Sequence, residues 1–383
     1  MLLKNYAFYY NFNEHFSHKN VSTLHLLSKI HNSEYNIFVD RFDILTEDCE
    51  YNLLSRCDSI EDIQSCKLLS FEECVRKRCD EIIDMAGYKK IYISYSGGVD
   101  STCIVCSFLM NERLNKDNFF VICNPFAIRE YELFYRLLIE QGVNIIAIDE
   151  SIESLINLTK DDVIFVNGNC GDQIDGSNIL SKRFASVEYF LPWKDALIKA
   201  ADLRHLRVSD KNISDVEEYI KLFGFEPEYA GDLSWFLGFA IKYNYAASYM
   251  KQLSYRPDNV VVFFDTIYFN KYGLVSYRMN REYKSQMSSF HYKLEWKKLI
   301  FSYTKDYDYF LHKGKEAPWI GTDFKANPGI SWSDEYGYHR IKNPTKRDIY
   351  FTLVRYIKPE FREYYSLKEY EVIDNKCNLF VEI

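Results

Sequence analysis

Two serines, two glycines and an aspartate stand together in the stretch Ser96-Gly97-Gly98-Val99-Asp100-Ser101. Glycine tolerates a positive φ and lets a ligand approach the backbone, and serine hydroxyls can donate hydrogen bonds. If a helix begins here, its first N–H groups lack partners within the helix and carry the positive end of its dipole. The stretch therefore predicts a cradle for an anion, most often a phosphate group. The plainer alternative is a glycine turn in which Asp100 or a serine caps the helix.

The residues around this stretch predict a strand before it and a helix after it. Residues 91–95 are mostly β-branched or aromatic, which is typical of a short buried strand. After Asp100, apolar side chains recur at helical spacing and predict a helix over about residues 101–111. The serines and glycines therefore lie in a strand-to-helix turn, which is where an anion cradle forms.

Strands and helices alternate from this point to residue 166. The expected strands are residues 91–95, 119–123, 144–148 and 163–166, and the expected helices are residues 101–111, 129–141 and 152–158. The alternation predicts an α/β fold with a doubly wound parallel sheet, in which ligands bind at the carboxyl ends of the strands. We expect an N-terminal appendage over residues 1–80 and a main domain over residues 81–383 with a helical C-terminal part.

A second polar turn, VNGNCGDQIDGS, spans residues 166–177 and follows the last of these strands. A plain loop would explain its glycines, but the carboxyl ends of parallel strands lie at one edge of the sheet, and this position favours a site. Asp172 is the candidate ligand for Mg²⁺, which prefers carboxylate and phosphate oxygens. We expect Asp100 and Asp172 to converge on the same metal ion and anion.

The stretch S-G-G-V-D-S resembles the pyrophosphate loop of the ATP pyrophosphatase (PP-loop) superfamily, whose members cleave ATP between its α and β phosphates. The spacing of a Walker A loop is absent. The resemblance implies ATP and Mg²⁺ as cofactors and an adenine nucleotide alpha-hydrolase-like fold. It also implies that pyrophosphate is held by Ser96, Gly97, Gly98, Asp100 and Ser101. Backbone near Ile122 and Cys123 would read the edge of the adenine, as similar positions do in that superfamily.

Within that superfamily, the second turn resembles the asparagine synthetase motif S-G-E-G-[SA]-D-E-[LV]-F-G-G. The resemblance implies that Asn167 and Gly168 lie near the ribose and adenine and that Asp172 binds magnesium. Two glutamates of the motif are replaced by Asn169 and Gln173. Because an amide cannot act as a base, the resemblance implies adenylation of a substrate followed by a different amine or a different deprotonation.

Two later segments resemble asparagine synthetases more weakly. Residues 311–319, LHKGKEAPW, resemble the segment whose lysine grips pyrophosphate in the transition state; Lys315 is the best match and Lys313 the second. An ammonium group placed over developing phosphate charge lowers the barrier, although a solvated basic turn is the plain alternative. Phe263-Phe264-Asp265 resembles the end of the motif P-F-L-D, and no site is carried over from it.

The resemblance implies an ATP-dependent, AMP-forming amide or C–N ligase that acts on an unidentified small-molecule acceptor. Asparagine synthetases carry a glutaminase domain whose nucleophile is the cysteine after the initiator methionine, whereas residue 2 is Leu2 here. We therefore expect the amine from solution, from the substrate, or from a separate amine-donor or carrier protein. The alternatives are a PP-loop enzyme that modifies a nucleobase or nucleic acid, and a non-catalytic ATP-binding protein with a degenerate site.

Composition narrows these alternatives. The net charge of −8 over 383 residues disfavours a broad electrostatic grip on nucleic acid. No uninterrupted apolar stretch reaches about 18 residues and no signal peptide is recognisable, so we expect a cytoplasmic protein that does not bind membranes. The ten cysteines are expected to be reduced. Cys103 and Cys106 form a C-x-x-C within a predicted helix, where burial in the core is favoured over a role in sulfur chemistry.

Overall fold

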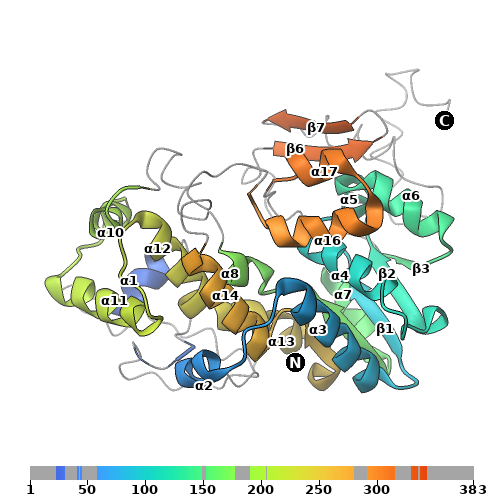
Figure 1. The fold of residues 1–383 in the computed structure, drawn as a ribbon, viewed down its shortest axis with the longest axis horizontal. Coiled ribbons are helices and arrows are strands. Elements are labelled where there is room, and N and C mark those ends of the chain that lie inside the picture. Colours follow the sequence, from blue (N-terminus) through green and yellow to red (C-terminus); the bar gives the residue numbers. More distant parts are fainter. Residues whose placement is uncertain are drawn as a thin grey trace. The chain divides into compact units, whose positions relative to one another are not determined.

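The computed structural model describes residues 23–30, 41–42, 44, 58–148, 152–176, 190–203, 205–279, 291–314, 329–334 and 337–342 (Figure 1). The chain divides into two compact units, each built from interleaved segments. The helical unit comprises residues 1–74, 169–252 and 264–287, and the sheet unit comprises residues 75–168, 253–263 and 288–383. The predicted division after residue 80 stays a prediction.

The sheet unit is built around five parallel strands in the order β3-β2-β1-β4-β5. Their bounds are Lys90–Ser94 (β1), Phe119–Cys123 (β2), Asn144–Ala147 (β3), Val163–Asn167 (β4) and Val260–Val262 (β5). The α/β class and the parallel sheet predicted from the sequence are confirmed. Because β2 and β4 flank β1, the turns that leave all three strands lie at the same edge of the sheet.

Burial explains the composition of these strands. Every residue of β4 and β5 is buried, as expected for a parallel sheet that is covered on both faces. Such strands read as continuous apolar runs, so β5, a run of three valines, could not be told from a piece of helix. The sequence analysis did not predict it.

Helices connect and cover the strands of the sheet unit. They are α3 (Phe71–Ala86), α4 (Val99–Leu109), η2 (Lys116–Asn118), α5 (Pro125–Glu130), α6 (Glu132–Glu140), α7 (Ile152–Asn157), η3 (Leu158–Lys160), η5 (Pro257–Asn259), α16 (Leu294–Thr304) and α17 (Tyr307–His312). An antiparallel pair, β6 (Gly329–Asp334) and β7 (Gly337–Lys342), forms a second sheet. The helix predicted over residues 129–141 is observed as α6, but residues 129 and 130 belong to the end of a separate helix, α5. Tyr131 leaves the helical region at φ −148° and ψ 76°, which divides the segment into α5 and α6.

The helical unit contains no strand of the five-stranded sheet. Its described elements are α1 (Thr23–Ile30), α2 (Ile60–Ser65), α8 (Gly171–Asp175), α10 (Trp193–Asp202), α11 (Asp210–Leu222), α12 (Ala230–Phe236), the π-helical turn η4 (Leu237–Lys242), α13 (Tyr243–Leu253) and α14 (Ile267–Met279). None of the helices described in either unit is long and apolar enough to cross a membrane.

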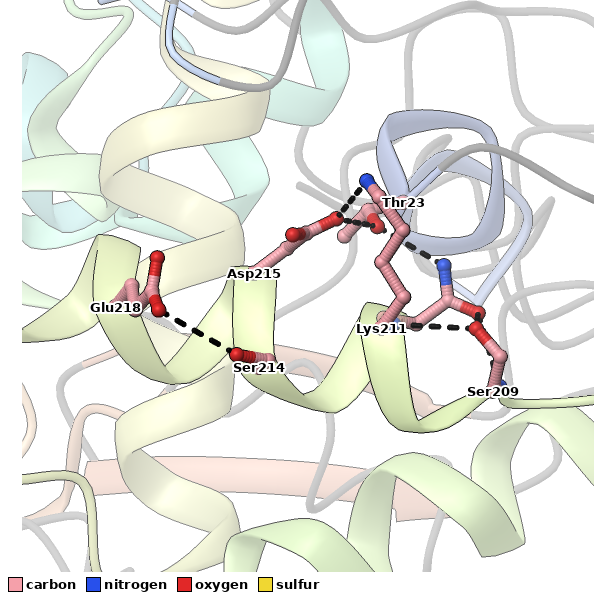
Figure 2. Close-up of polar contacts among 7 residues, drawn as sticks. Thr23, Ser209, Lys211, Ser214, Asp215 and Glu218 are labelled. Carbon is pink, nitrogen blue, oxygen red and sulfur yellow. Dashed lines mark hydrogen bonds and ion pairs between the residues drawn. The ribbon is translucent and has the colours of Figure 1, made fainter.

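A buried threonine joins α1 to α11 in the helical unit (Figure 2). The Thr23 hydroxyl donates to Asp215 Oδ2 at 2.6 Å and accepts from the amide of Asn212 at 2.9 Å. Lys211 Nζ also donates to Asp215 Oδ2, at 2.9 Å. These polar contacts fix the start of α1 against a helix that lies 192 residues away in the chain.

Candidate functional site

The turn between β1 and α4 is closed by its own serines. The hydroxyls of Ser96 and Ser101 share a hydrogen bond of 3.0 Å, and the Ser101 hydroxyl also accepts from the Ser96 N–H at 3.1 Å. Thr102 adds a hydrogen bond from its hydroxyl to the carbonyl of Gly98 at 2.9 Å. The turn therefore holds a fixed shape, with Gly98, which has no side chain to cap the helix, as the N-cap of α4.

Gly97 is the tightest point of this turn. Its φ is +78°, and a Cβ placed on it would lie 2.5 Å from the carbonyl oxygen of Ala127 and 2.6 Å from Glu130 Cβ. Neither the backbone angle nor the space tolerates a side chain. The backbone of the turn is thus packed directly against α5.

The end of β4 packs against the start of α4. A Cβ placed on Gly168 would lie 3.2 Å from Asp100 Cβ and 3.5 Å from the Ser101 nitrogen. Asn167, the last residue of β4, is buried, and its carbonyl accepts from the Phe263 N–H at 2.9 Å. Asn167 and Gly168 thus lie at the edge of the sheet that carries the glycine turn, as the sequence analysis expected for the two turns.

Three buried lysines gather around this edge, all from the segment of residues 293–313. Lys313 is 1% exposed, and its Nζ donates to Glu130 Oε1 at 2.8 Å. Glu130 Oε1 itself would lie 3.6 Å from a Cβ on Gly98, so this ammonium group lies beside the glycine turn. Lys297 Nζ donates to the carbonyl of Lys313 at 3.3 Å.

The third lysine reaches the first turn of α4. Lys293 is completely buried, and its Nζ forms an ion pair with Asp100 Oδ2. It immediately precedes α16, which packs along α4 in the sheet unit (Figure 1). Beside the anion cradle predicted from the sequence, the Lys293 ammonium therefore compensates the negative charge of Asp100.

The remaining predicted site residues are placed as follows. The carbonyls of Ile122 and Cys123, at the end of β2, accept from the Tyr95 and Ile148 N–H groups at 2.9 and 3.0 Å. Their predicted contact with adenine stays a prediction. Asp172 is half-buried on α8 in the helical unit, and its convergence with Asp100 is likewise untested. Lys315 lies outside the described residues.

Asn169 and Gln173, which replace the glutamates of the synthetase motif, lie with Asp172 in the helical unit. The amide of Asn169 donates to the carbonyl of Ala246 at 2.9 Å, and Gln173 is buried. An amide nitrogen that donates to a carbonyl cannot act as a base.

The cysteines of α4 are core residues, as the sequence analysis favoured. Cys103 and Cys106 are both completely buried. Burial raises the pKa of both thiols well above the ordinary value, and the neighbouring Asp100 carboxylate raises the pKa of Cys103 further. Both thiols therefore stay protonated at neutral pH, which makes them poor nucleophiles.

The sequence analysis missed Lys293, Lys297 and Glu130. The sequence does show that Lys293 and Lys297 are spaced i, i+4, as are the apolar residues Trp296 and Ile300. In the structure all four side chains are buried. A lysine pair on such a face needs buried partners. The partners are distant in sequence, and no local pattern identifies them.

Comparison with known proteins adds no assignment, since no protein-family model and no curated protein matches the chain. Among the described residues, no group of three or more His, Cys, Asp or Glu side chains is arranged to hold a metal ion.

Proposed function

We propose that the chain is an ATP-dependent, AMP-forming ligase of the PP-loop type, built on a doubly wound sheet. In this proposal a carboxylate oxygen of the acceptor attacks the α phosphorus of ATP, and the bond to the β phosphate breaks to release pyrophosphate. An amine then displaces AMP and forms an amide. The observation that carries the proposal is the glycine turn at the carboxyl end of β1, with the buried Lys313 ammonium beside it.

The turn binds the pyrophosphate end of ATP through its backbone. The first N–H groups of α4 point out of the helix and carry the positive end of its dipole, and the Ser96 hydroxyl is exposed beside them. Because Gly97 has no side chain, the turn packs closely against α5, which holds its backbone N–H groups in one arrangement. The hydrogen bonds within the turn hold these donors in place before ATP arrives, which reduces the reorganisation needed in the transition state.

Lys313 supplies positive charge where pyrophosphate departs. The sequence analysis ranked it second to Lys315, and its ion pair with the buried Glu130 now favours it. Glu130 holds the ammonium in one position, so the charge is in place as negative charge grows on the leaving group. A solvated basic turn, the plain alternative for this segment, does not describe a lysine that is 1% exposed.

Magnesium would need few protein ligands in the proposed reaction. Mg²⁺ usually keeps several waters and binds through one or two carboxylates together with substrate phosphates. Asp172, half-buried on α8, is the carboxylate we assign to it. When bound, the ion would neutralise charge on the departing pyrophosphate. Asn169 removes no proton, so the attacking amine loses its proton to another group, or the amine arrives uncharged.

Exchange of labelled pyrophosphate into ATP tests the proposal. The full chain is incubated with Mg²⁺, ATP and labelled pyrophosphate, together with pools of carboxylates or of nucleobases. We expect exchange that depends on the carboxylate pool, because reversible adenylation returns the label to ATP. Exchange that depends on the nucleobase pool would instead support base modification. Absence of exchange with every pool, from protein that binds ATP, would support a non-catalytic site.

A further inference from the structure

The ion pair between Lys293 and Asp100 is buried at the point where the first turn of α4 meets the glycine turn. Lys293 is completely buried, while the Asp100 side chain is 22% exposed. A lysine side chain is almost never fully buried unless its charge is paired. The Lys293 ammonium is therefore fixed beside the glycine turn, and the solvent-exposed member of the ion pair is Asp100.

The backbone of Lys293 is held in a conformation that lysine rarely adopts. Its φ and ψ are both 48°, in the left-handed region, directly before α16. Residues other than glycine occupy this region at a cost in free energy, and such residues persist where surrounding contacts hold them. The ion pair with Asp100 is one contact that holds Lys293 in this conformation. The strained backbone and the buried charge therefore both indicate that Lys293 is positioned to pair with Asp100.

Asp100 on its own would weaken the predicted cradle. A carboxylate beside an anion site repels phosphate unless a cation compensates its charge. The sequence analysis expected that cation to be Mg²⁺, on which Asp100 and Asp172 would converge. In the structure the Lys293 ammonium forms an ion pair with Asp100.

We propose that Lys293 takes the place of a metal ion at Asp100, so that this side of the pyrophosphate site carries a built-in cation. This role of Lys293 rests on the proposed function, because it requires a pyrophosphate group at the glycine turn. The ammonium charge is present at every magnesium concentration, whereas a metal ion must be captured from solution. The turn therefore binds pyrophosphate without magnesium, and magnesium is required only as the ion that the proposed function assigns to Asp172.

Calorimetric binding of inorganic pyrophosphate to the full chain, in EDTA and in Mg²⁺, tests this role. For the unaltered chain we expect the Kd in EDTA to lie within about tenfold of the Kd in Mg²⁺, because the fixed ammonium supplies part of the charge a metal would supply. Lys293→Met should weaken binding in EDTA by at least about 100-fold, since it removes a buried charge at the site. Magnesium should restore part of that loss, because the freed Asp100 carboxylate can then take a metal ion.

Two further variants separate this role from a purely structural one. Asp100→Asn with Lys293→Met removes both charges, and replacing a buried ion pair by neutral groups often leaves stability unchanged. We expect this double variant to fold and to show no restoration by magnesium. Lys298→Met is the matched control, because Lys298 lies on the same helix, is exposed, and pairs with Glu295 at 2.6 Å. It should bind pyrophosphate like the unaltered chain.

The outcomes distinguish this role from the proposed function. Pyrophosphate binding by the unaltered chain only when Mg²⁺ is present would overturn the role of Lys293 and leave the ligase proposal standing. Unchanged binding by Lys293→Met in EDTA would overturn it as well. Absence of pyrophosphate binding by the unaltered chain in both buffers would overturn the pyrophosphate site itself, and the role of Lys293 with it.

Discussion

At the scale of single residues, the glycine turn leaves little freedom for substitution. Gly97 has a positive φ and lies against the Ala127 carbonyl and Glu130, so the chain needs glycine at this position for two separate reasons. Lys313 and Glu130 form a buried ion pair beside the same turn. The chemistry proposed for the site therefore depends on residues that also hold the local structure together.

Gly97→Ala should lower the free energy of unfolding by about 3 kcal/mol, from the left-handed backbone and from steric overlap together. Gly87→Ala is the matched control: Gly87 also has a positive φ, of +55°, but no atom lies within 4 Å of an added Cβ. Gly87→Ala should lower the free energy of unfolding by only about 1 kcal/mol, because only the left-handed backbone opposes it. Urea unfolding of both variants measures the difference. Equal losses would show that the contact with α5 does not restrict Gly97.

The residues of the turn were predictable because they are contiguous in the sequence, and their spacing between a strand and a helix carries the signal. The charged groups beside it were not. Glu130 and Lys313 are 183 residues apart, and Asp100 and Lys293 are 193 apart. Only the folded chain brings such partners together, so the sequence pattern predicted an anion site but did not predict the lysines that lie beside the turn.

At the scale of elements, the hydrophobic pattern and the residue types of each segment predicted four strands of the sheet, and both ends of each strand were placed to within one residue. The division of residues 129–141 into α5 and α6 was not predictable, because it depends on contacts made by Tyr131. The Tyr131 ring stacks on Tyr309, with 3.9 Å between ring centroids, and its hydroxyl donates to Asp306 at 3.0 Å. These distant partners hold Tyr131 outside the helical region. Tertiary contacts overrode a continuous helical pattern here.

The junction of α1 with α11 offers an element-scale test. Thr23→Val keeps the shape of the side chain but leaves the buried Asn212 amide without the hydroxyl to which it donates. We expect a loss of about 1–3 kcal/mol in the free energy of unfolding, the usual cost of such a lost partner.

The control for Thr23→Val is Ser214→Ala. Ser214 lies on the same helix but makes only an exposed contact of 3.4 Å with Glu218 (Figure 2). It should change stability by less than about 0.5 kcal/mol. Equal effects of the two variants in urea unfolding would contradict the assigned role of Thr23.

At the scale of the whole molecule, the chain passes between its two units several times, and the turn after β4 is divided between them. Asn167 and Gly168 belong to the sheet unit, whereas Asn169 and Asp172 belong to the helical unit. The sequence pattern could not predict this division, because one continuous motif spans the boundary. The function proposed for the whole chain nevertheless depends on one element, a glycine turn that would serve AMP-forming chemistry.

The products of ATP cleavage test that claim most directly. The full chain is incubated with Mg²⁺, ATP labelled in the α phosphate, and pools of carboxylates and amines, and the nucleotide products are separated. We expect AMP and pyrophosphate in equal amounts, because pyrophosphate is the leaving group in the proposed reaction and the turn lacks the lysine of a Walker A loop. Formation of ADP and phosphate without AMP would contradict it.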